Sequence, residues 1–405
     1  MRAGLAESNS SKPFALAATE IIRSCVHCGM CNASCPTYQL TGDELEGPRG
    51  RIYLIKGILE TGETSDVAQT HLDQCLVCRS CEASCPSGVK YGELLELTKP
   101  HIESSNPSPL GLRIKRYLIV QIVPSKVLFS IFFAVGRILK PLLSSNLKTL
   151  IPERVSLRVL SRVHHKRKAL LLSTCAQSVV RPSIDTAAIR IFDRLGITLI
   201  PVAGAGCCGA LALHCGYEDK AIVQAKANID AWWPYIELGA ESIIATSSGC
   251  GLQLKGYERL LKEFPDYSAK SKHLAGLIRD PIELIDDQKL SAVIKDSDRC
   301  SVVFQSPCSL QHGLKINGRV EAVLERLGWN LTKVKDPHLC CGSAGSYSIL
   351  YPETSAALRE EKLNALCQGS PELIVTANIG CQLHLAAKSA VPVIHWLELI
   401  ERELN

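Results

Sequence analysis

Residues 25–36 read CVHCGMCNASCP, and residues 75–86 read CLVCRSCEASCP. Both stretches have the spacing Cys-x2-Cys-x2-Cys-x3-Cys-Pro, which is typical of proteins that bind two cubane 4Fe-4S clusters. In such proteins the first three cysteines of a run bind one cluster, and the fourth, which precedes Pro, binds the other. We therefore expect one cluster on Cys25, Cys28, Cys31 and Cys85, and a second on Cys75, Cys78, Cys81 and Cys35.

Zinc binding and disulfide bonds are the alternatives to iron-sulfur clusters. Zinc sites usually combine two Cys-x2-Cys pairs rather than closely spaced triplets. The chain has 19 cysteines in 405 residues, and this odd, clustered set does not resemble the disulfide framework of a secreted domain. The stretch that precedes Cys25 contains no continuous apolar run, so we expect no secretory signal. The composition indicates an intracellular redox protein of several domains.

The stretch between the two cysteine runs has helical periodicity. Ile52, Ile55 and Leu59 fall on one face of a helix over residues 49–59. We therefore expect residues 1–105 to form a mainly helical ferredoxin-like dicluster domain. Arg49 and Arg51 lie either near a cluster, where positive charge would raise its potential, or on a solvated turn before the helix.

Residues 106–168 form a basic segment with thirteen Lys or Arg and one acid, whereas the whole chain has a net charge of only +5. The segment contains the apolar run VLFSIFFAVG at residues 127–136, which is too short for a bilayer span of about 20 residues. A basic amphipathic connector favours peripheral contact with anionic lipid or docking of an acidic partner subunit. A connector packed on neighbouring domains is the alternative. We find no nucleic-acid-binding motif and expect no nucleic-acid partner.

The second half contains an internal repeat that its cysteines mark. Each unit has a single Cys, then a Cys-Cys-Gly triplet at the same distance along the chain, and then a further Cys. This matching spacing predicts two similar domains, over residues 169–297 and 298–405. The cysteines are Cys175, Cys207, Cys208 and Cys250 in the first unit, and Cys308, Cys340, Cys341 and Cys381 in the second.

Short apolar stretches precede the cysteines of both units and predict buried strands. They lie at residues 169–172, 242–245, 302–304 and 373–375, and helical patterns intervene at 184–195 and 320–327. Each unit therefore reads as an α/β domain with a parallel sheet, and the whole chain as an α+β multidomain protein. Thiols at the carboxyl ends of parallel strands occupy the usual place for a site in such sheets.

The adjacent cysteines suit thiolate bonds to iron, since the following Gly permits close backbone approach. We expect one or two further iron-sulfur clusters, one in each unit or one shared by both. Structural cysteines or metal-free redox thiols are the alternative. The unpaired Cys215, Cys300 and Cys367 are expected in the core. Four histidines near the sets either bind a cluster, shuttle protons, or are simply hydrogen-bonded; they are His214, His312, His338 and His384.

Two 4Fe-4S runs followed by two Cys-Cys-Gly domains resemble the iron-sulfur electron-transfer subunits related to heterodisulfide reductase. Within that group, residues 25–57 and the stretches NIDAWWP, HLCCGSAG and IVTANIGCQLHL are similar to the iron-sulfur subunits of bacterial glycolate oxidase. The similarity runs from about residue 15 to the end. In one respect the chain departs from the heterodisulfide reductase relatives, whose motif ends in Cys-x2-Cys. Ser247 and Asn378 replace the first of these cysteines, so we expect four-thiolate rather than five-thiolate sites.

The resemblance implies that flavin-containing glycolate oxidase subunits oxidise glycolate to glyoxylate. It also implies that this chain passes the electrons to quinone or another membrane acceptor, at the cytoplasmic face of the inner membrane. We expect conduction rather than catalysis, because thiolate-bound clusters transfer single electrons whereas a flavin accepts two. We expect no dinucleotide-binding fingerprint, no flavin in this chain and no catalytic residues.

Four alternative functions share this architecture or its cofactors. The chain could serve a lactate dehydrogenase or a glycerol-3-phosphate dehydrogenase, or a heterodisulfide reductase-like complex. A cluster-based redox sensor is the alternative outside electron transport.

Overall fold

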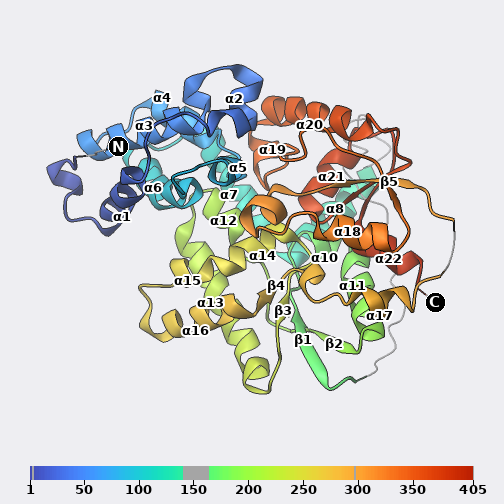
Figure 1. Cartoon of the computed structure of the whole chain (residues 1–405). Coiled ribbons are helices and arrows are strands. Elements are labelled where there is room, and N and C mark those ends of the chain that lie inside the picture. The colour runs from blue at the N-terminus through green and yellow to red at the C-terminus, as the bar shows by residue number, and fades with distance from the viewer. Residues whose placement is uncertain (2–3, 140–163, 296–297, 405) are drawn as a thin grey trace.

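The computed structural model describes residues 1, 4–139, 164–295 and 298–404. A helical N-terminal part lies beside two parallel sheets that are covered by helices (Figure 1). The predicted fold class, a helical dicluster domain followed by two α/β units, is confirmed.

The N-terminal domain consists of helices in the part that the structure describes. The helix predicted over residues 49–59 is present as α3, and Ile52, Ile55 and Leu59 are buried in the core of this domain. Proline begins α1, α2 and α3, where its missing N–H costs no hydrogen bond. The elements are η1 (Glu7–Asn9), α1 (Pro13–Arg23), η2 (Asn32–Ser34), α2 (Pro36–Thr41), η3 (Glu44–Glu46), α3 (Pro48–Thr61), α4 (Asp66–Asp73), α5 (Ser80–Ala83) and α6 (Tyr91–Ser105).

The first Cys-Cys-Gly unit contains a four-stranded parallel sheet with the strand order β2-β1-β3-β4. Its strands are β1 (Arg167–Leu171), β2 (Ile197–Pro201), β3 (Ile243–Ile244) and β4 (Ile278–Arg279). Its helices are α10 (Gln177–Val180), α11 (Ser183–Arg194), α12 (Ala210–His214), α13 (Glu218–Glu237), α14 (Ser248–Lys255), α15 (Tyr257–Leu260), α16 (Pro265–Leu277), η5 (Pro281–Glu283) and α17 (Asp287–Ser291).

The second unit repeats this topology with the parallel order β6-β5-β7-β8. Its strands are β5 (Ser301–Gln305), β6 (Asn330–Leu331), β7 (Leu373–Thr376) and β8 (Val393–His395). Its helices are η6 (Ser309–Gly313), α18 (Arg319–Arg326), α19 (Tyr347–Leu350), α20 (Pro352–Cys367), α21 (Ile379–Ala386) and α22 (Trp396–Arg402). The predicted strands therefore exist in both units, with bounds that differ slightly at their ends.

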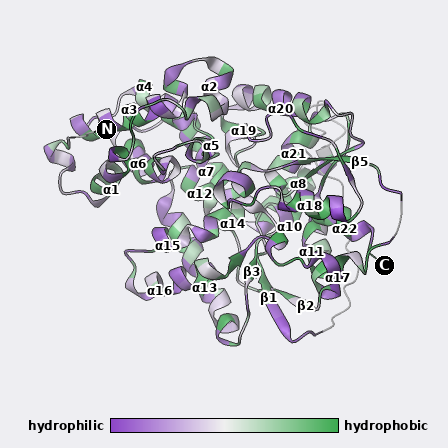
Figure 2. Cartoon of the chain, in the orientation of Figure 1, coloured by the Kyte–Doolittle hydropathy of each residue, from purple (hydrophilic) through white to green (hydrophobic). Residues whose placement is uncertain are grey.

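One hydrophobic core joins the two units. Ala169 and Leu171 on one face of β1 belong to the same buried cluster as Val302 and Phe304 of β5, and Figure 2 shows hydrophobic residues in β5. Helices α11 and α22 pack against each other, and Ser183 Oγ donates to a Glu398 carboxylate oxygen at 2.6 Å. The two units are therefore built around shared apolar surface.

The opposite face of each sheet is covered by helices of its own unit. Leu170 of β1 packs with Trp232 of α13, and Val303 of β5 packs with Leu366 of α20. Each sheet is thus buried on both faces, as its near-continuous apolar strands predict.

The expected connector over residues 106–168 is described in part, because residues 140–163 lie outside the described ranges. Its first helix, α7 (Leu110–Ile122), packs between the N-terminal domain and both Cys-Cys-Gly units. Arg116 is buried there and donates to Asp73 at 2.7 Å and to Glu103 at 2.9 Å. Lys220 of α13 donates to the Val120 carbonyl at 2.8 Å. Of the predicted alternatives for the connector, packing on the neighbouring domains therefore applies to α7.

The second connector helix, α8 (Lys126–Leu139), leaves much of its apolar surface exposed. Phe132 is 60% exposed and Ile138 77%. Val127, Ile131, Val135 and Ile138 follow one another at helical spacing and form one stripe. Among the described residues no single helix is long and apolar enough to cross a membrane; α7 and α8 reach that length only together, and they are bent by 105° at their junction.

The Arg116 ion pairs generate a stability prediction. The substitution Arg116→Met should lower the free energy of unfolding by about 3 kcal/mol, because Asp73 and Glu103 would lose a buried partner. Urea unfolding of the anaerobic, iron-loaded protein would measure this. Arg113→Met, at an exposed position of the same helix, is the matched control and should change stability by less than about 0.5 kcal/mol. Equal urea midpoints of unfolding for the two variants would contradict the stabilising role of the Arg116 ion pairs.

Candidate iron-sulfur sites

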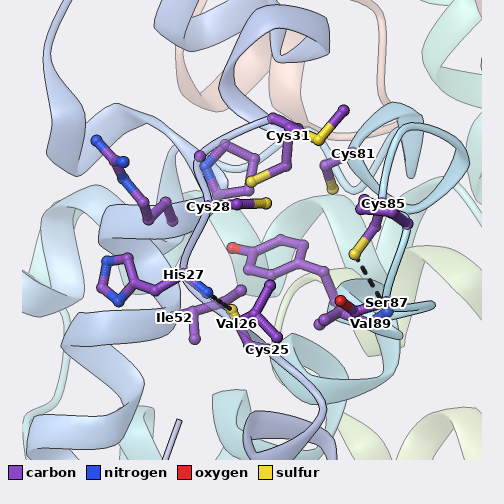
Figure 3. A pocket seen from close by; sticks show the side chains of 16 residues that line it. Cys25, Val26, His27, Cys28, Cys31, Ile52, Cys81, Cys85, Ser87 and Val89 are labelled. Carbon is purple, nitrogen blue, oxygen red and sulfur yellow. Dashed lines mark hydrogen bonds between the residues drawn. The ribbon is translucent and has the colours of Figure 1, made fainter.

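The cysteines of the two ferredoxin-type runs line two cavities in the N-terminal domain. The first cavity encloses about 430 Å³ outside the protein atoms and the second about 350 Å³, in each case including some open solvent. The first is lined by Cys25, Cys28, Cys31, Cys81 and Cys85 (Figure 3). The second is lined by Cys35, Cys75, Cys78 and Cys81. The structure thus places Cys85 beside the first triplet and Cys35 beside the second.

The Cys-Pro pair accounts for this exchange at Cys35. Cys35 is extended, with ψ at 118°, and Pro36 begins α2. Because proline favours the first helical position, the chain turns there and leaves Cys35 facing the second cavity. Four thiolates are the donor number that a 4Fe-4S cube requires, so the residues present fit such a cluster in each cavity. The assignment of individual ligands stays a prediction.

The same backbone turn recurs in both cysteine runs. His27 and Val77, one residue before the second cysteine, have φ of 60° and 51°, and Gly29 and Arg79 beyond it have φ of 81° and 59°. Positive φ is rare for a β-branched residue such as Val77 and costs on the order of 1–3 kcal/mol. The turns point the His27 and Val77 amides at the first cysteine sulfur of each run, both at 3.4 Å. Such N–H···S contacts favour the charged thiolate and tune a cluster's potential.

Burial makes these thiols poor acids in the absence of metal. Desolvation raises the pKa of Cys31 to about 11, and the neighbouring Cys25, Cys85 and Cys28 add to the effect. Desolvation also raises the pKa of Cys75, although the positive charge of Arg51 partly offsets this rise. Closely packed thiolates therefore need a positive centre between them, and iron supplies one.

Arg49 lines the first cavity and Arg51 lines the second. Of the two alternatives for these residues, the place beside the predicted cluster sites therefore applies. Arg49 donates to Glu44 at 2.6 Å. Arg51 is buried and donates to Glu46 at 2.5 Å and to Thr37 Oγ1 at 3.0 Å. Desolvation opposes its charge, but Cys75, Tyr91, Cys35 and Glu46 outweigh it and raise the pKa of Arg51.

Tyr91 was not singled out from the sequence, and it lines both cavities. It begins α6 and is buried, with its hydroxyl beside the Cys75 thiol. Desolvation raises its pKa far above the ordinary value, so the phenol stays neutral. Only its place directly after the second cysteine run marks it in the sequence.

The four cysteines of the first Cys-Cys-Gly unit lie together. Cys175 interacts with Cys207, Cys207 with Cys208, and Cys208 with Cys250. The backbone that carries the pair is held by Asn228 and Tyr257, whose side chains donate to the carbonyls of Cys207 and Cys208 at 2.9 Å each.

The second unit gathers its thiols in the same way. The sulfurs of Cys308 and Cys340 are 4.0 Å apart, and those of Cys341 and Cys381 are 3.2 Å apart. Hydrogen bonds hold the pKa of the Cys340 thiol well below its usual range; the bond from Cys308 has the larger effect and the bond from Cys341 the smaller.

The glycine of each triplet is required by its backbone conformation. Gly209 and Gly342 have φ of 87° and 86°. A Cβ at Gly342 would lie 2.7 Å from the Ser355 carbonyl oxygen of α20, so the helix packs closely behind the cysteine pair. This is the close backbone approach that the Cys-Cys-Gly sequence predicts.

The second cavity and the second unit are neighbours. Cys78 lies near enough to Cys340 and Cys308 for their charges to interact. Leu76, from the same ligand loop, packs with Cys340 and Leu358 in one buried cluster. Thiols of the N-terminal domain therefore continue directly into those of the second Cys-Cys-Gly unit.

Ser247 and Asn378 meet where the two units face each other. Ser247 Oγ donates to Asn378 Oδ1 at 2.6 Å, and Asn378 Nδ2 donates to the Cys381 sulfur at 3.6 Å. The positions that carry an extra cysteine in the heterodisulfide reductase relatives are thus occupied here by a hydrogen-bonded polar pair.

The remaining histidines and cysteines have ordinary surroundings. His312 donates to the His338 carbonyl at 3.0 Å, and His384 contacts Ser355. Burial lowers the pKa of His214 to about 4. Cys215 is buried as expected and Cys367 is half-buried, but Cys300 is exposed just before β5, so its expected core position was wrong.

The stretch GAGCCG at residues 204–209 has the letters of Gly-x-Gly-x-x-Gly, contrary to the expectation that this pattern is absent. Its context does not suit dinucleotide binding. It follows the edge strand β2 and opens the short helix α12. The Gly206 amide donates to Asn228 Oδ1 at 2.7 Å, and the two intervening residues are Cys207 and Cys208 of the thiol set.

The fold and these thiol sets define an iron-sulfur protein, and the comparisons agree. Residues 21–89 match the 4Fe-4S dicluster domain family, and residues 169–255 and 302–386 both match the cysteine-rich domain family. The glycolate oxidase iron-sulfur subunit of Escherichia coli is 46% identical over the whole length of both chains. The probable glycolate oxidase iron-sulfur subunit of Bacillus subtilis is 28% identical over 89% of this chain and 88% of its own.

One solved structure has a related fold. The crystal structure of a hypothetical protein from Helicobacter pylori has a TM-score of 0.53 and 9% identity, and the match covers 88% of this chain and 67% of that one. The chain belongs to the family of glycolate oxidase iron-sulfur subunits, and it is an electron-transfer component of an oxidoreductase complex.

The exchanged positions of Cys35 and Cys85 generate a testable assignment. Cys35→Ser should chiefly impair the cluster held by Cys75, Cys78 and Cys81, because that set loses its fourth thiol. Cys85→Ser is the matched variant and should impair the other cluster. Low-temperature electron paramagnetic resonance of the reduced proteins, with iron analysis, would resolve the two signals. Loss of the Cys25, Cys28 and Cys31 signal in Cys35→Ser would contradict the assignment.

Proposed function

We propose that this chain conducts electrons, one at a time, to quinone in the membrane. The electrons come from flavin-containing subunits that oxidise glycolate. The glycolate specificity is supported by the 46% identity to the Escherichia coli subunit over its full length. The observation that carries the conduction is that Cys78 and Cys308 pack against the same buried cluster, which contains Cys340. It connects the thiol sets of the N-terminal domain to the thiol set of the second Cys-Cys-Gly unit.

The proposed reaction balances in electrons and protons. Oxidation of one glycolate to glyoxylate delivers two electrons and two protons to the flavin and to solvent. When bound, iron-sulfur clusters accept and release single electrons. Two electrons and two protons then convert one quinone to quinol. This chain fixes the order of the thiol sets and encloses most of them in protein, and it supplies no catalytic residue of its own.

We assign four thiols to each proposed cluster. Cys25, Cys28, Cys31 and Cys85 hold one cube, and Cys75, Cys78, Cys81 and Cys35 hold the other. Each Cys-Cys-Gly set holds one further cluster, because its four thiols lie together while Ser247 and Asn378 stand between the units. These sets are Cys175, Cys207, Cys208 and Cys250, and Cys308, Cys340, Cys341 and Cys381.

We also propose that α8 contacts the cytoplasmic face of the membrane. The exposed apolar stripe of α8 lies in the basic segment, which suits an anionic lipid surface. Lys126 at its start donates to Ser173 Oγ at 2.8 Å, two residues before Cys175. Lipid contact there would bring quinone close to the thiols of the first unit.

The conduction proposal predicts which step of electron transfer is lost when the thiols of the second Cys-Cys-Gly unit are removed. In the assembled complex, converting both Cys340 and Cys341 to Ser should leave flavin reduction by glycolate unchanged and lower quinone reduction at least tenfold, because only the downstream thiols change. Stopped-flow absorbance and quinol production would measure the two steps. Cys300→Ser, outside every set, is the control. A folded double variant that keeps its iron and its full quinone reduction would refute the proposal.

The membrane proposal predicts a loss of lipid affinity. Ile131→Glu combined with Phe132→Glu should weaken binding to phosphatidylglycerol vesicles at least tenfold, since a buried Ile or Phe is worth about 1.5–3 kcal/mol. Vesicle sedimentation at several salt concentrations would measure it. Leu238→Glu, at a position 80% exposed at the end of α13, should bind as the unchanged protein does. Equal binding of all three proteins would count against α8.

A further inference from the structure

Exposed apolar side chains surround one part of the first cysteine cavity. Val26 is 67% exposed, Met30 57% and Tyr53 59%. Val26 and Met30 flank Cys28 in the ligand loop and line the cavity, as Figure 3 shows for Val26. The Tyr53 ring on α3 lies 6.2 Å from the His27 ring, between centroids. We call Val26, Met30 and Tyr53 the rim patch.

The rim patch surrounds the most accessible of the predicted ligands. All sixteen predicted ligand cysteines lie in the described part of the chain, and Cys28 alone among them is exposed. The thiols of the second cavity are covered instead: Leu76 and Cys78 pack against Cys340 and Leu358 of the second unit. Because electron transfer weakens steeply with distance, an external donor would approach these thiol sets most closely at Cys28.

The charges around the rim patch are paired within the chain. Arg49 pairs with Glu44 at 2.6 Å, and Lys56 pairs with Glu60 at 2.6 Å while its ammonium lies 5.8 Å from the Tyr53 ring centroid. The patch is therefore apolar with a neutralised border. Such a surface suits an apolar protein interface, and it differs from the basic segment that contains α8.

The two exposed apolar surfaces adjoin different thiol sets. The rim patch adjoins the first cavity, whereas α8 packs beside α10 and bonds to Ser173 near Cys175. In Figure 1, α3 and α8 lie on different sides of the molecule. Donor and membrane can therefore bind at the same time, each on its own surface.

We propose that the rim patch is the surface to which the flavin-containing subunit binds, with its flavin facing Cys28. This inference rests on the proposed function, since it names the place where the donor delivers its electrons. The iron-sulfur cluster that Cys25, Cys28, Cys31 and Cys85 would hold accepts the flavin's electrons one at a time, and the flavin's protons go to solvent.

Binding of the purified flavin-containing subunits to the anaerobic, iron-loaded chain tests the rim patch. Met30→Glu and Tyr53→Glu should each weaken binding at least tenfold, because a carboxylate would be buried against an apolar surface. Tyr53 lies on α3 outside the ligand loop, so its variant should keep its iron content and its reduction by dithionite even if the Met30 variant does not. Leu238→Glu and Phe132→Glu are matched exposed controls at the end of α13 and on α8, and both should bind normally.

The outcomes separate this inference from the function on which it rests. Normal binding of the flavin-containing subunits by Tyr53→Glu would overturn the rim patch as their docking site. Failure of glycolate to reduce the unaltered, correctly assembled complex would overturn the proposed function and leave the subunit-binding result standing.

Discussion

Thiols that are buried side by side cannot all lose their protons unless a positive centre lies between them. Around the two cavities, burial raises the pKa of Cys31, Cys75 and Cys81. The N-terminal helices therefore enclose groups that are stable as thiolates only when a cation such as iron lies among them. The strained loop at Val77 and the buried Arg51 are part of the same arrangement, because both direct favourable dipoles or charge toward sulfur. Packing of the domain and cluster binding thus depend on each other.

Local pattern predicted some of the elements. Cysteine spacing and apolar periodicity placed the dicluster region, the four predicted strands and the helices α3, α11 and α18, because each depends on a few neighbouring residues. The contact between Cys78 and Cys340 joins positions in different domains, and no local pattern encodes it. Tyr91 was missed for the same reason, since its role comes from lying between two cavities. The GAGCCG stretch is the opposite case. It matches the letters of the dinucleotide-binding pattern, but its place between an edge strand and a short helix does not suit dinucleotide binding.

The duplicated units have the same topology and different neighbours. The second unit packs against Leu76 and Cys78 of the N-terminal domain, whereas the first bonds to α8 through Ser173 and pairs Arg259 with Glu96 of α6. Sequence similarity between the units could not reveal this difference, because it arises from what each unit contacts. Equivalent cysteine sets therefore occupy different places in the series, one inside the molecule and one toward the exposed helix.

The shared core has a consequence for how the second half folds. Ala169, Leu171, Val302 and Phe304 belong to one apolar cluster, so neither sheet is fully covered without the other. A unit expressed alone would leave that face open to water and prone to aggregate. The two units therefore match one domain family and form a single cooperative body in folding, which ties the loss of either thiol set on heating to the loss of both.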